Sequence, residues 1–136
     1  MTIGMTPYLQ FPGTARQALE FYHSALGGEM EMMTYAQGMG TEDESKDLIM
    51  HGSLFIDRGV HLMAADAPPG MSSVLGTVSL SNSAPDDAEH STLEQWWAKL
   101  SEGAEITEPL AKSPWGDTFG MLTDKFGVPW MVNASR

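Results

Sequence analysis

The stretch ALEFYHSALGGE, residues 18–29, determines how the first half of the chain is interpreted. Its apolar residues recur at the spacing of one face of an α-helix, and the pair Gly27-Gly28 ends the pattern. Upstream, Thr14 and Gln17 have the spacing of a capping box, which fixes an N-terminus. The pattern therefore predicts a helix over residues 15–26.

Short apolar segments on both sides of this helix predict the strands of a small sheet. The segment between residues 36 and 47 is glycine-rich and acidic, and we expect it to be a loop. Asp57-Arg58-Gly59 is typical of a tight hairpin turn. The predicted strands are Tyr8–Phe11, Glu29–Tyr35, Ile49–Ile56 and Val60–Ala65.

The second half of the chain repeats this plan. A shift of 74 positions aligns Leu19 with Leu93 and Leu26 with Leu100, inside the stretch LEQWWAKLSEG of residues 93–103. The terminal hairpin of each half also matches, with one residue inserted at Phe126. The second-half elements are a helix that begins near Pro85 and ends before Gly103, and the strands Gly76–Ser81, Ala104–Leu110, Phe119–Thr123 and Gly127–Val132.

An internal repeat of this kind predicts one α+β domain made of two tandem βαβββ modules. We place module one at residues 1–66, a linker rich in proline and glycine at 67–75, and module two at 76–136. One module has an apolar sheet face that it cannot cover alone. Two modules that curve together bury much of it and leave a concave surface, which is a common site for small molecules.

Composition excludes several classes of function. Eighteen acidic residues against seven basic ones give a net charge of −11, which disfavours nucleic acid and anionic membrane surfaces as partners. The chain has no cysteine, so disulfides, thiol catalysis and thiolate-bound metals are excluded. Residues 1–7 have neither the basic nor the apolar region of a signal peptide, and we expect a cytoplasmic protein.

Eight short motifs are spread over nearly the whole chain: TPYL at 6–9, ALEFY at 18–22, LGGE at 26–29, LMAADAPPG at 62–70, WGD at 115–117, FGM at 119–121, DKFGV at 124–128 and WMVN at 130–133. Together they resemble the PhnB-like branch of the vicinal oxygen chelate superfamily, which includes glyoxalases and bleomycin-resistance proteins. The resemblance implies the two-module fold and a homodimer whose modules pair within or between chains. Members are often labelled demethylubiquinone methyltransferases, but no glycine-rich S-adenosylmethionine loop follows the first strand.

The superfamily pattern also implies where a metal would bind, on the first and last strands of each module. Those positions fall at Pro7 or Tyr8, at Met63, at Thr77 and at Met131. None is the histidine, glutamate or glutamine of the glyoxalase pattern, and thioether sulfur suits soft copper instead of the usual divalent ions. We therefore predict no metal cofactor.

The remaining candidates for chemistry are two histidines and one loop. His51 and His61 lie on the two strands of one predicted hairpin, and alternation places His61 on the face of Met63. Each is either a pocket residue, half of a metal site, or a satisfied polar residue of the sheet. Trp115 and Asp117 either form an aromatic lid with a hydrogen-bond acceptor, or pack and close a turn. The full set of pocket candidates is Tyr8, His51, His61, Met63, Thr77, Trp115, Asp117 and Met131.

Three functions remain open at this point. Eleven methionines, several of them in strands, favour a pocket for an apolar or aromatic small molecule. The second interpretation is a metal-dependent lyase, isomerase or dioxygenase-like enzyme that uses His51 or His61 with Asp117. The third is a structural or regulatory homodimer whose cavity is vestigial.

Overall fold

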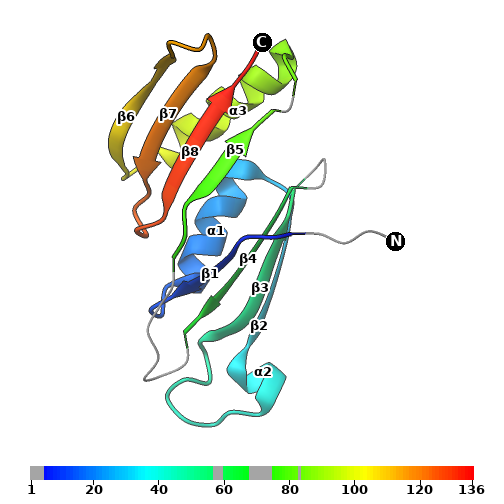
Figure 1. The fold of residues 1–136 in the computed structure, drawn as a ribbon. Coiled ribbons are helices and arrows are strands. Elements are labelled where there is room, and N and C mark those ends of the chain that lie inside the picture. The colour runs from blue at the N-terminus through cyan, green and yellow to red at the C-terminus, as the bar shows by residue number, and fades with distance from the viewer. Residues whose placement is uncertain (1–4, 57–59, 68–74, 83) are drawn as a thin grey trace. The chain divides into compact units, whose positions relative to one another are not determined.

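The chain forms two compact units, residues 1–75 and 76–136, each built on its own four-stranded sheet (Figure 1). The structure is a computed structural model that describes residues 5–56, 60–67, 75–82 and 84–136. These units are called unit 1 and unit 2 below. The predicted α+β fold of two tandem βαβββ modules is confirmed, with one mixed sheet in each module.

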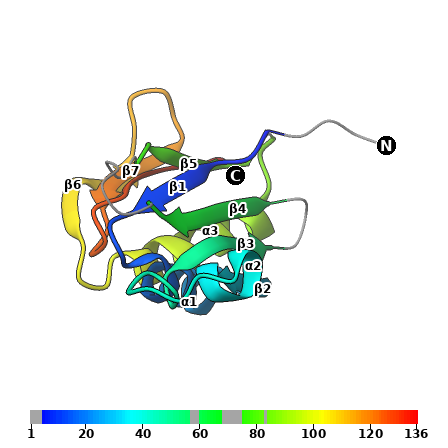
Figure 2. The same ribbon diagram turned by 90° about the horizontal axis from the view of Figure 1, so that it is seen from below.

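Unit 1 is a sheet with the strand order β1-β4-β3-β2, in which β1 and β4 are parallel and the other pairs antiparallel. Figure 2 shows β1, β4 and β3 running side by side. The elements are β1 (Tyr8–Phe11), α1 (Ala15–Leu26), β2 (Glu29–Thr34), α2 (Tyr35–Met39), β3 (Ile49–Phe55) and β4 (His61–Asp66).

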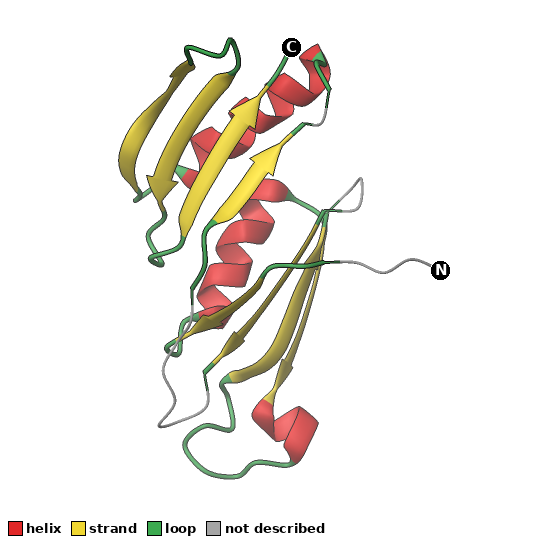
Figure 3. Cartoon of the chain, in the orientation of Figure 1, coloured by secondary structure: helices red, strands yellow, loops and turns green. Residues whose placement is uncertain are grey.

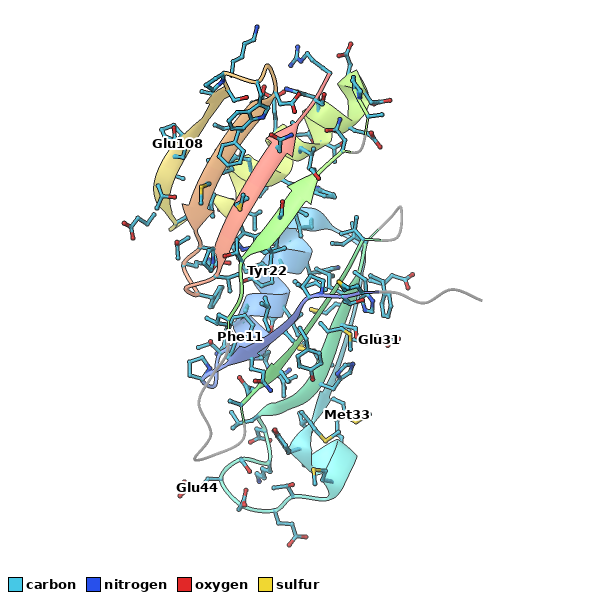
Figure 4. The ribbon with its side chains drawn as sticks, in the orientation of Figure 1. Phe11, Tyr22, Glu31, Met33, Glu44 and Glu108 are labelled. Atoms are coloured by element: carbon cyan, nitrogen blue, oxygen red, sulfur yellow. The ribbon has the colours of Figure 1, made fainter. Side chains whose placement is uncertain are left out.

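One face of this sheet is buried by α1. Phe11 and Tyr22 are both fully buried in unit 1 and are labelled in Figure 4. Gly52 of β3 lies under this helix, because a side chain there would overlap with Leu19. Because side chains alternate along a strand, the neighbours of Gly52 on β3, His51 and Ser53, point away from α1.

The opposite face, called the unit 1 open face, carries the residues that α1 does not cover. Tyr8 pairs with Met63 across β1 and β4, and Ser53 of β3 pairs with Met63 on its other side. His51 pairs with Met33 of β2 one step along the sheet. In the other direction Phe55 pairs with His61, and the sheet thus presents a mixed polar and apolar surface.

Unit 2 repeats the arrangement with the strand order β5-β8-β7-β6 (Figure 3). Trp97 packs under β7 at Gly120, where a side chain would meet its indole. The unit 2 open face carries Met131 paired with Met121, and Asn133 paired with Phe119. The elements are β5 (Val78–Ser81), α3 (Asp87–Leu100), β6 (Glu105–Lys112), β7 (Thr118–Thr123) and β8 (Pro129–Ala134).

A buried carboxylate fixes the core of unit 1. The side chain of Asp66 is only 2% exposed, and its two oxygens accept the backbone N–H groups of Ala15 and Ile49, each at 2.9 Å. Asp66 thus caps α1 from the end of β4. The predicted capping box was wrong, because the side chain of Thr14 makes no capping hydrogen bond.

Unit 2 uses Asp124 in a related way. Its side chain is 4% exposed, accepts the backbone N–H groups of Phe126 and Val128, and accepts the indole N–H of Trp130 at 2.8 Å. The carboxylate therefore closes the β7–β8 turn and fixes the largest fully buried side chain of the core.

Several predicted boundaries need correction. Residues 36–39, expected in a loop, and Tyr35, expected at the end of a strand, form the short helix α2, and Thr34 with Gln37 makes the complete capping box there. The last strand runs over Pro129–Ala134 instead of Gly127–Val132. Strand β6 continues to Lys112, beyond the predicted end at Leu110. The predicted turn at residues 57–59 and most of the linker lie outside the described residues. Within the described part of the chain, no helix is both long and apolar enough to cross a membrane.

The change Asp66→Asn tests the capping role of this carboxylate. Asparagine has the same shape but turns an N–H₂ group toward one of the two backbone donors, which leaves that buried donor unsatisfied. We expect the free energy of unfolding to fall by about 2–3 kcal/mol, measured by urea denaturation. Asp47→Asn, at an exposed aspartate, is the matched control and should leave the midpoint unchanged. Equal midpoints for the two variants would contradict the assignment.

Candidate functional site

On the unit 1 open face, three polar side chains form a hydrogen-bonded chain. The Tyr8 hydroxyl lies 3.3 Å from Nδ1 of His51, and the Ser53 hydroxyl lies 3.3 Å from Nε2 of the same ring. They come from β1 and β3, so the sheet register brings them together although they are far apart in the sequence. We call this set the Tyr8–His51–Ser53 relay.

The phenol of Tyr8 stays protonated over a wide pH range. Burial raises its pKa above the ordinary tyrosine value of 10.0, and the neighbouring Tyr35 phenol raises the pKa further. The Tyr35 hydroxyl itself donates to the backbone carbonyl of Asp66 at 3.2 Å. At neutral pH, Tyr8 is therefore an uncharged donor and acceptor.

His61 lies on the same open face but does not join His51. Its ring stacks on Phe55 with centroids 4.1 Å apart and planes at 19°. Because His61 pairs with Phe55, four residues along β3 from His51, the two histidine Cα atoms are about 14 Å apart. This spacing is too long for both rings to bind one ion.

The described residues do not fit the metal implied by the fold family. The partner of Met131 on β5 is Ser79 and not Thr77. Thr77 lies just before β5 and is exposed. In unit 1 the corresponding pair is Tyr8 and Met63. Hydroxyl and thioether groups are a poor donor set for a hard divalent ion. No group of three histidine or acidic side chains in the described ranges could hold a metal ion.

The unit 2 open face contains a hollow of about 290 Å³ where β6 ends and β7 begins. Trp115 stands over Phe119 in an edge-to-face arrangement with ring centroids 5.3 Å apart. Glu108, labelled in Figure 4, contributes an acidic side of the hollow from β6. The lining residues are Glu108, Pro109, Ala111, Lys112, Ser113, Pro114, Trp115, Phe119 and Met121.

The indole of Trp115 is exposed but held in place. Its ring N–H donates to the side-chain oxygen of Asn133 at 3.1 Å, and the Asn133 amide donates to the Asp117 carboxylate at 2.9 Å. The residue is 61% exposed, so these bonds position an aromatic surface that solvent or a ligand can reach. The Asp117 carboxylate thus holds the Asn133 side chain, which in turn holds the Trp115 ring.

The other two histidines serve local structure. His23 bonds to the backbone carbonyl of Gly28 after α1. His90, which is 3% exposed, contacts the hydroxyl of Thr118 at 3.0 Å and the carboxylate of Glu94 at 2.8 Å. Neither ring lies among the residues that line the hollow or form the relay.

The structure brings the predicted site residues into groups within each unit. Tyr8 and Met63 pair directly with each other, and Trp115 is linked to Asp117 through Asn133. Sequence reasoning missed Ser53, Phe55, Phe119, Met121 and Asn133 as site residues. Alternation was the available signal for Ser53 and Phe55, because both share the strand face of His51.

Comparisons with known proteins give a consistent result. The model of the family described as 3-demethylubiquinone-9 3-methyltransferase matches residues 4–133. Protein YjdN of Escherichia coli K12 is 32% identical to this chain over 149 aligned positions, which cover 97% of this chain and 95% of YjdN.

Solved structures resemble the fold along the whole chain. Protein PA1353 from Pseudomonas aeruginosa is 34% identical, with 98% of both chains covered and a TM-score of 0.79. A PhnB protein from Bacillus cereus is 22% identical, with 98% of this chain and all of that chain covered and a TM-score of 0.63. A glyoxalase/bleomycin resistance protein/dioxygenase superfamily member from Sphaerobacter thermophilus is 17% identical, with 99% and 98% covered and a TM-score of 0.57.

The change Asn133→Ala tests whether Asn133 fixes the Trp115 ring. Loss of one hydrogen bond should speed hydrogen exchange of the Trp115 indole N–H by about 2–10-fold, measured by NMR. The Trp130 indole N–H, which donates to Asp124, is the internal control and should keep its exchange rate. Unchanged exchange at Trp115 would show that Asn133 does not hold the ring.

Proposed function

Because the chain belongs to the 3-demethylubiquinone-9 3-methyltransferase family, the PhnB-like group within the glyoxalase/bleomycin resistance/dioxygenase superfamily, we propose that it binds a small apolar or aromatic molecule. The binding site is the hollow of unit 2. Its volume is at the low end of the range for small-molecule pockets, and its lining is largely apolar.

The observation that carries this proposal is the exposed, fixed indole of Trp115. Tryptophan side chains are highly buried on average in folded proteins, whereas Trp115 is 61% exposed. Here Asn133 holds the ring beside Phe119, so a flat ligand meets a preformed aromatic surface and orders few side chains when it binds. Met121 supplies an adaptable apolar contact on the floor of the hollow.

Binding without methyl transfer agrees best with the residues present. The family description names a methyltransferase, but the sequence after the first strand contains only Pro12-Gly13 and no glycine-rich cofactor loop. The sheets of both units have a mixed order in which the first and last strands are neighbours. We therefore propose a ligand-binding role that needs no S-adenosylmethionine.

A metal-dependent lyase, isomerase or dioxygenase-like enzyme is the second candidate. Only the fold family favours it. Two observations speak against it: His51 and His61 are too far apart to share an ion, and the Asp117 carboxylate already accepts a hydrogen bond from the Asn133 amide. We also propose a cytoplasmic location and, from the family resemblance, a homodimer. Sedimentation equilibrium measures the oligomeric state directly.

The change Trp115→Leu tests the proposed site. Loss of the aromatic contacts should weaken binding of the neutral fluorescent probe N-phenyl-1-naphthylamine by about 3–10-fold in a fluorescence titration. Trp96→Leu is the matched control, because Trp96 lies on α3 and lines no part of the hollow. The proposal fails if both variants bind the probe as tightly as the wild type.

Metal content separates the two candidate functions. Protein purified without chelator should contain well below one iron, zinc, manganese, cobalt or nickel ion per chain by plasma mass spectrometry, because the described donors do not converge. If one ion per chain is found and the changes His51→Ala or His61→Ala remove it, the enzyme candidate replaces the binding proposal.

A further inference from the structure

We propose that unit 1 carries a second binding surface, on which the Tyr8 hydroxyl donates a hydrogen bond to a neutral carbonyl oxygen of a flat aromatic compound. His51 and Ser53 hold that hydroxyl in place through the hydrogen bonds of the relay. This surface goes beyond the proposed function. It lies in unit 1, and it offers a ligand a hydrogen-bond donor, whereas the hollow of unit 2 was proposed to bind through aromatic and apolar contacts.

The hydrogen atoms of the relay can be counted. Tyr8, Ser53 and a neutral His51 contribute one hydrogen each, so three donors are available for the two hydrogen bonds within the relay. One donor is therefore always left over. It belongs to Tyr8 if the relay runs from Ser53 to Tyr8, and to Ser53 if it runs the other way.

The burial of Ser53 decides in which direction the hydrogen bonds of the relay run. The side chain of Ser53 is 6% exposed, and a buried hydroxyl without an acceptor is costly, so its hydrogen goes to Nε2 of His51. Nδ1 then carries the ring hydrogen and donates to the Tyr8 oxygen. The hydroxyl hydrogen of Tyr8, which is 43% exposed, is left pointing away from the relay, where water or a ligand can accept it. Successive hydrogen bonds polarise one another and strengthen this terminal donor.

The neighbouring side chains indicate an aromatic partner. Met63 pairs with both Tyr8 and Ser53, and the stacked rings of Phe55 and His61 lie one step further along the sheet. Among the described residues, Nε2 of His61 is a buried nitrogen without a hydrogen-bond partner. The surface beside the relay thus offers a thioether and two aromatic rings to a flat ligand.

The charges on the same face disfavour an anionic acceptor. Glu31 pairs with Ser53 and Glu29 pairs with Phe55 across β2 and β3, and both side chains are exposed. Two carboxylates repel a carboxylate or phosphate ligand, whereas they have little effect on a neutral carbonyl. The ligand class is therefore an aromatic ketone, ester or amide.

A pair of probes that differ in one carbonyl tests this directly. In ¹⁵N-labelled wild-type protein, 2-acetylnaphthalene should shift the ring nitrogens of His51 and bind at the relay about 2–10-fold more tightly than 2-ethylnaphthalene. The free protein should show His51 with its hydrogen on Nδ1. Finding the hydrogen on Nε2 would overturn the direction of the relay and with it the proposal.

Three variants locate the donor. Tyr8→Phe should abolish the preference for the acetyl compound, and Ser53→Ala should reduce it because Nδ1 is no longer the favoured site of the ring hydrogen. Tyr35→Phe is the matched control and should keep the preference, because that hydroxyl already donates to Asp66. A preference that survives Tyr8→Phe would overturn the proposal.

The same spectra separate this inference from the proposed function. The Trp115 indole N–H reports on the hollow of unit 2, and the His51 ring reports on the relay. A response of Trp115 without one of His51 overturns the relay alone, and the reverse result overturns the hollow alone. If neither responds to either compound, both proposals are wrong.

Discussion

The two hydrogen bonds that the buried carboxylate of Asp66 accepts set the geometry of unit 1. They join the end of β4 to the first residue of α1 and to the start of β3, and so fix which face of the sheet the helix covers. Asp124 performs a comparable task in unit 2, where it closes the β7–β8 turn around Trp130. Each charge is buried, and each is satisfied by N–H groups whose positions it then determines.

The open faces follow from that constraint. Once α1 covers one side, strand alternation leaves Tyr8, His51 and Ser53 on the other, where polar groups must find partners among themselves. In unit 2 the same alternation leaves Asn133 on the uncovered side, where it accepts the indole N–H of Trp115 from the loop before β7. Both faces thus combine fixed polar groups with methionine and aromatic rings, which suits small molecules better than acid–base chemistry on a metal.

The sequence predicted the fold well because its strongest signals are local. Helical spacing with Gly27-Gly28 set the bounds of α1, and the repeat set the order of elements in both units. The cap of α1 was missed because Asp66 is 51 positions from Ala15 and only the folded sheet brings them together. Helix α2 was missed because glycines suggested a loop, although Thr34 and Gln37 carried a capping signal.

The candidate site was predicted only in part, because spacing along the sequence does not show which residues the strand register brings together. Alternation identified the faces of His61 and Met63, but strand register decides that His61 pairs with Phe55 and stays away from His51. Asn133 links Trp115 to Asp117 from 16 positions further along the chain, which no spacing rule indicates. The central claim is that the open faces, and not the helix-covered ones, bind the ligand. NMR of ¹³C-methyl-labelled methionines during titration with 2-acetylnaphthalene tests it most directly. The account predicts shifts at Met63 and Met121 with none at Met30 and Met32, whose strand positions face α1, whereas equal shifts at both pairs would contradict it.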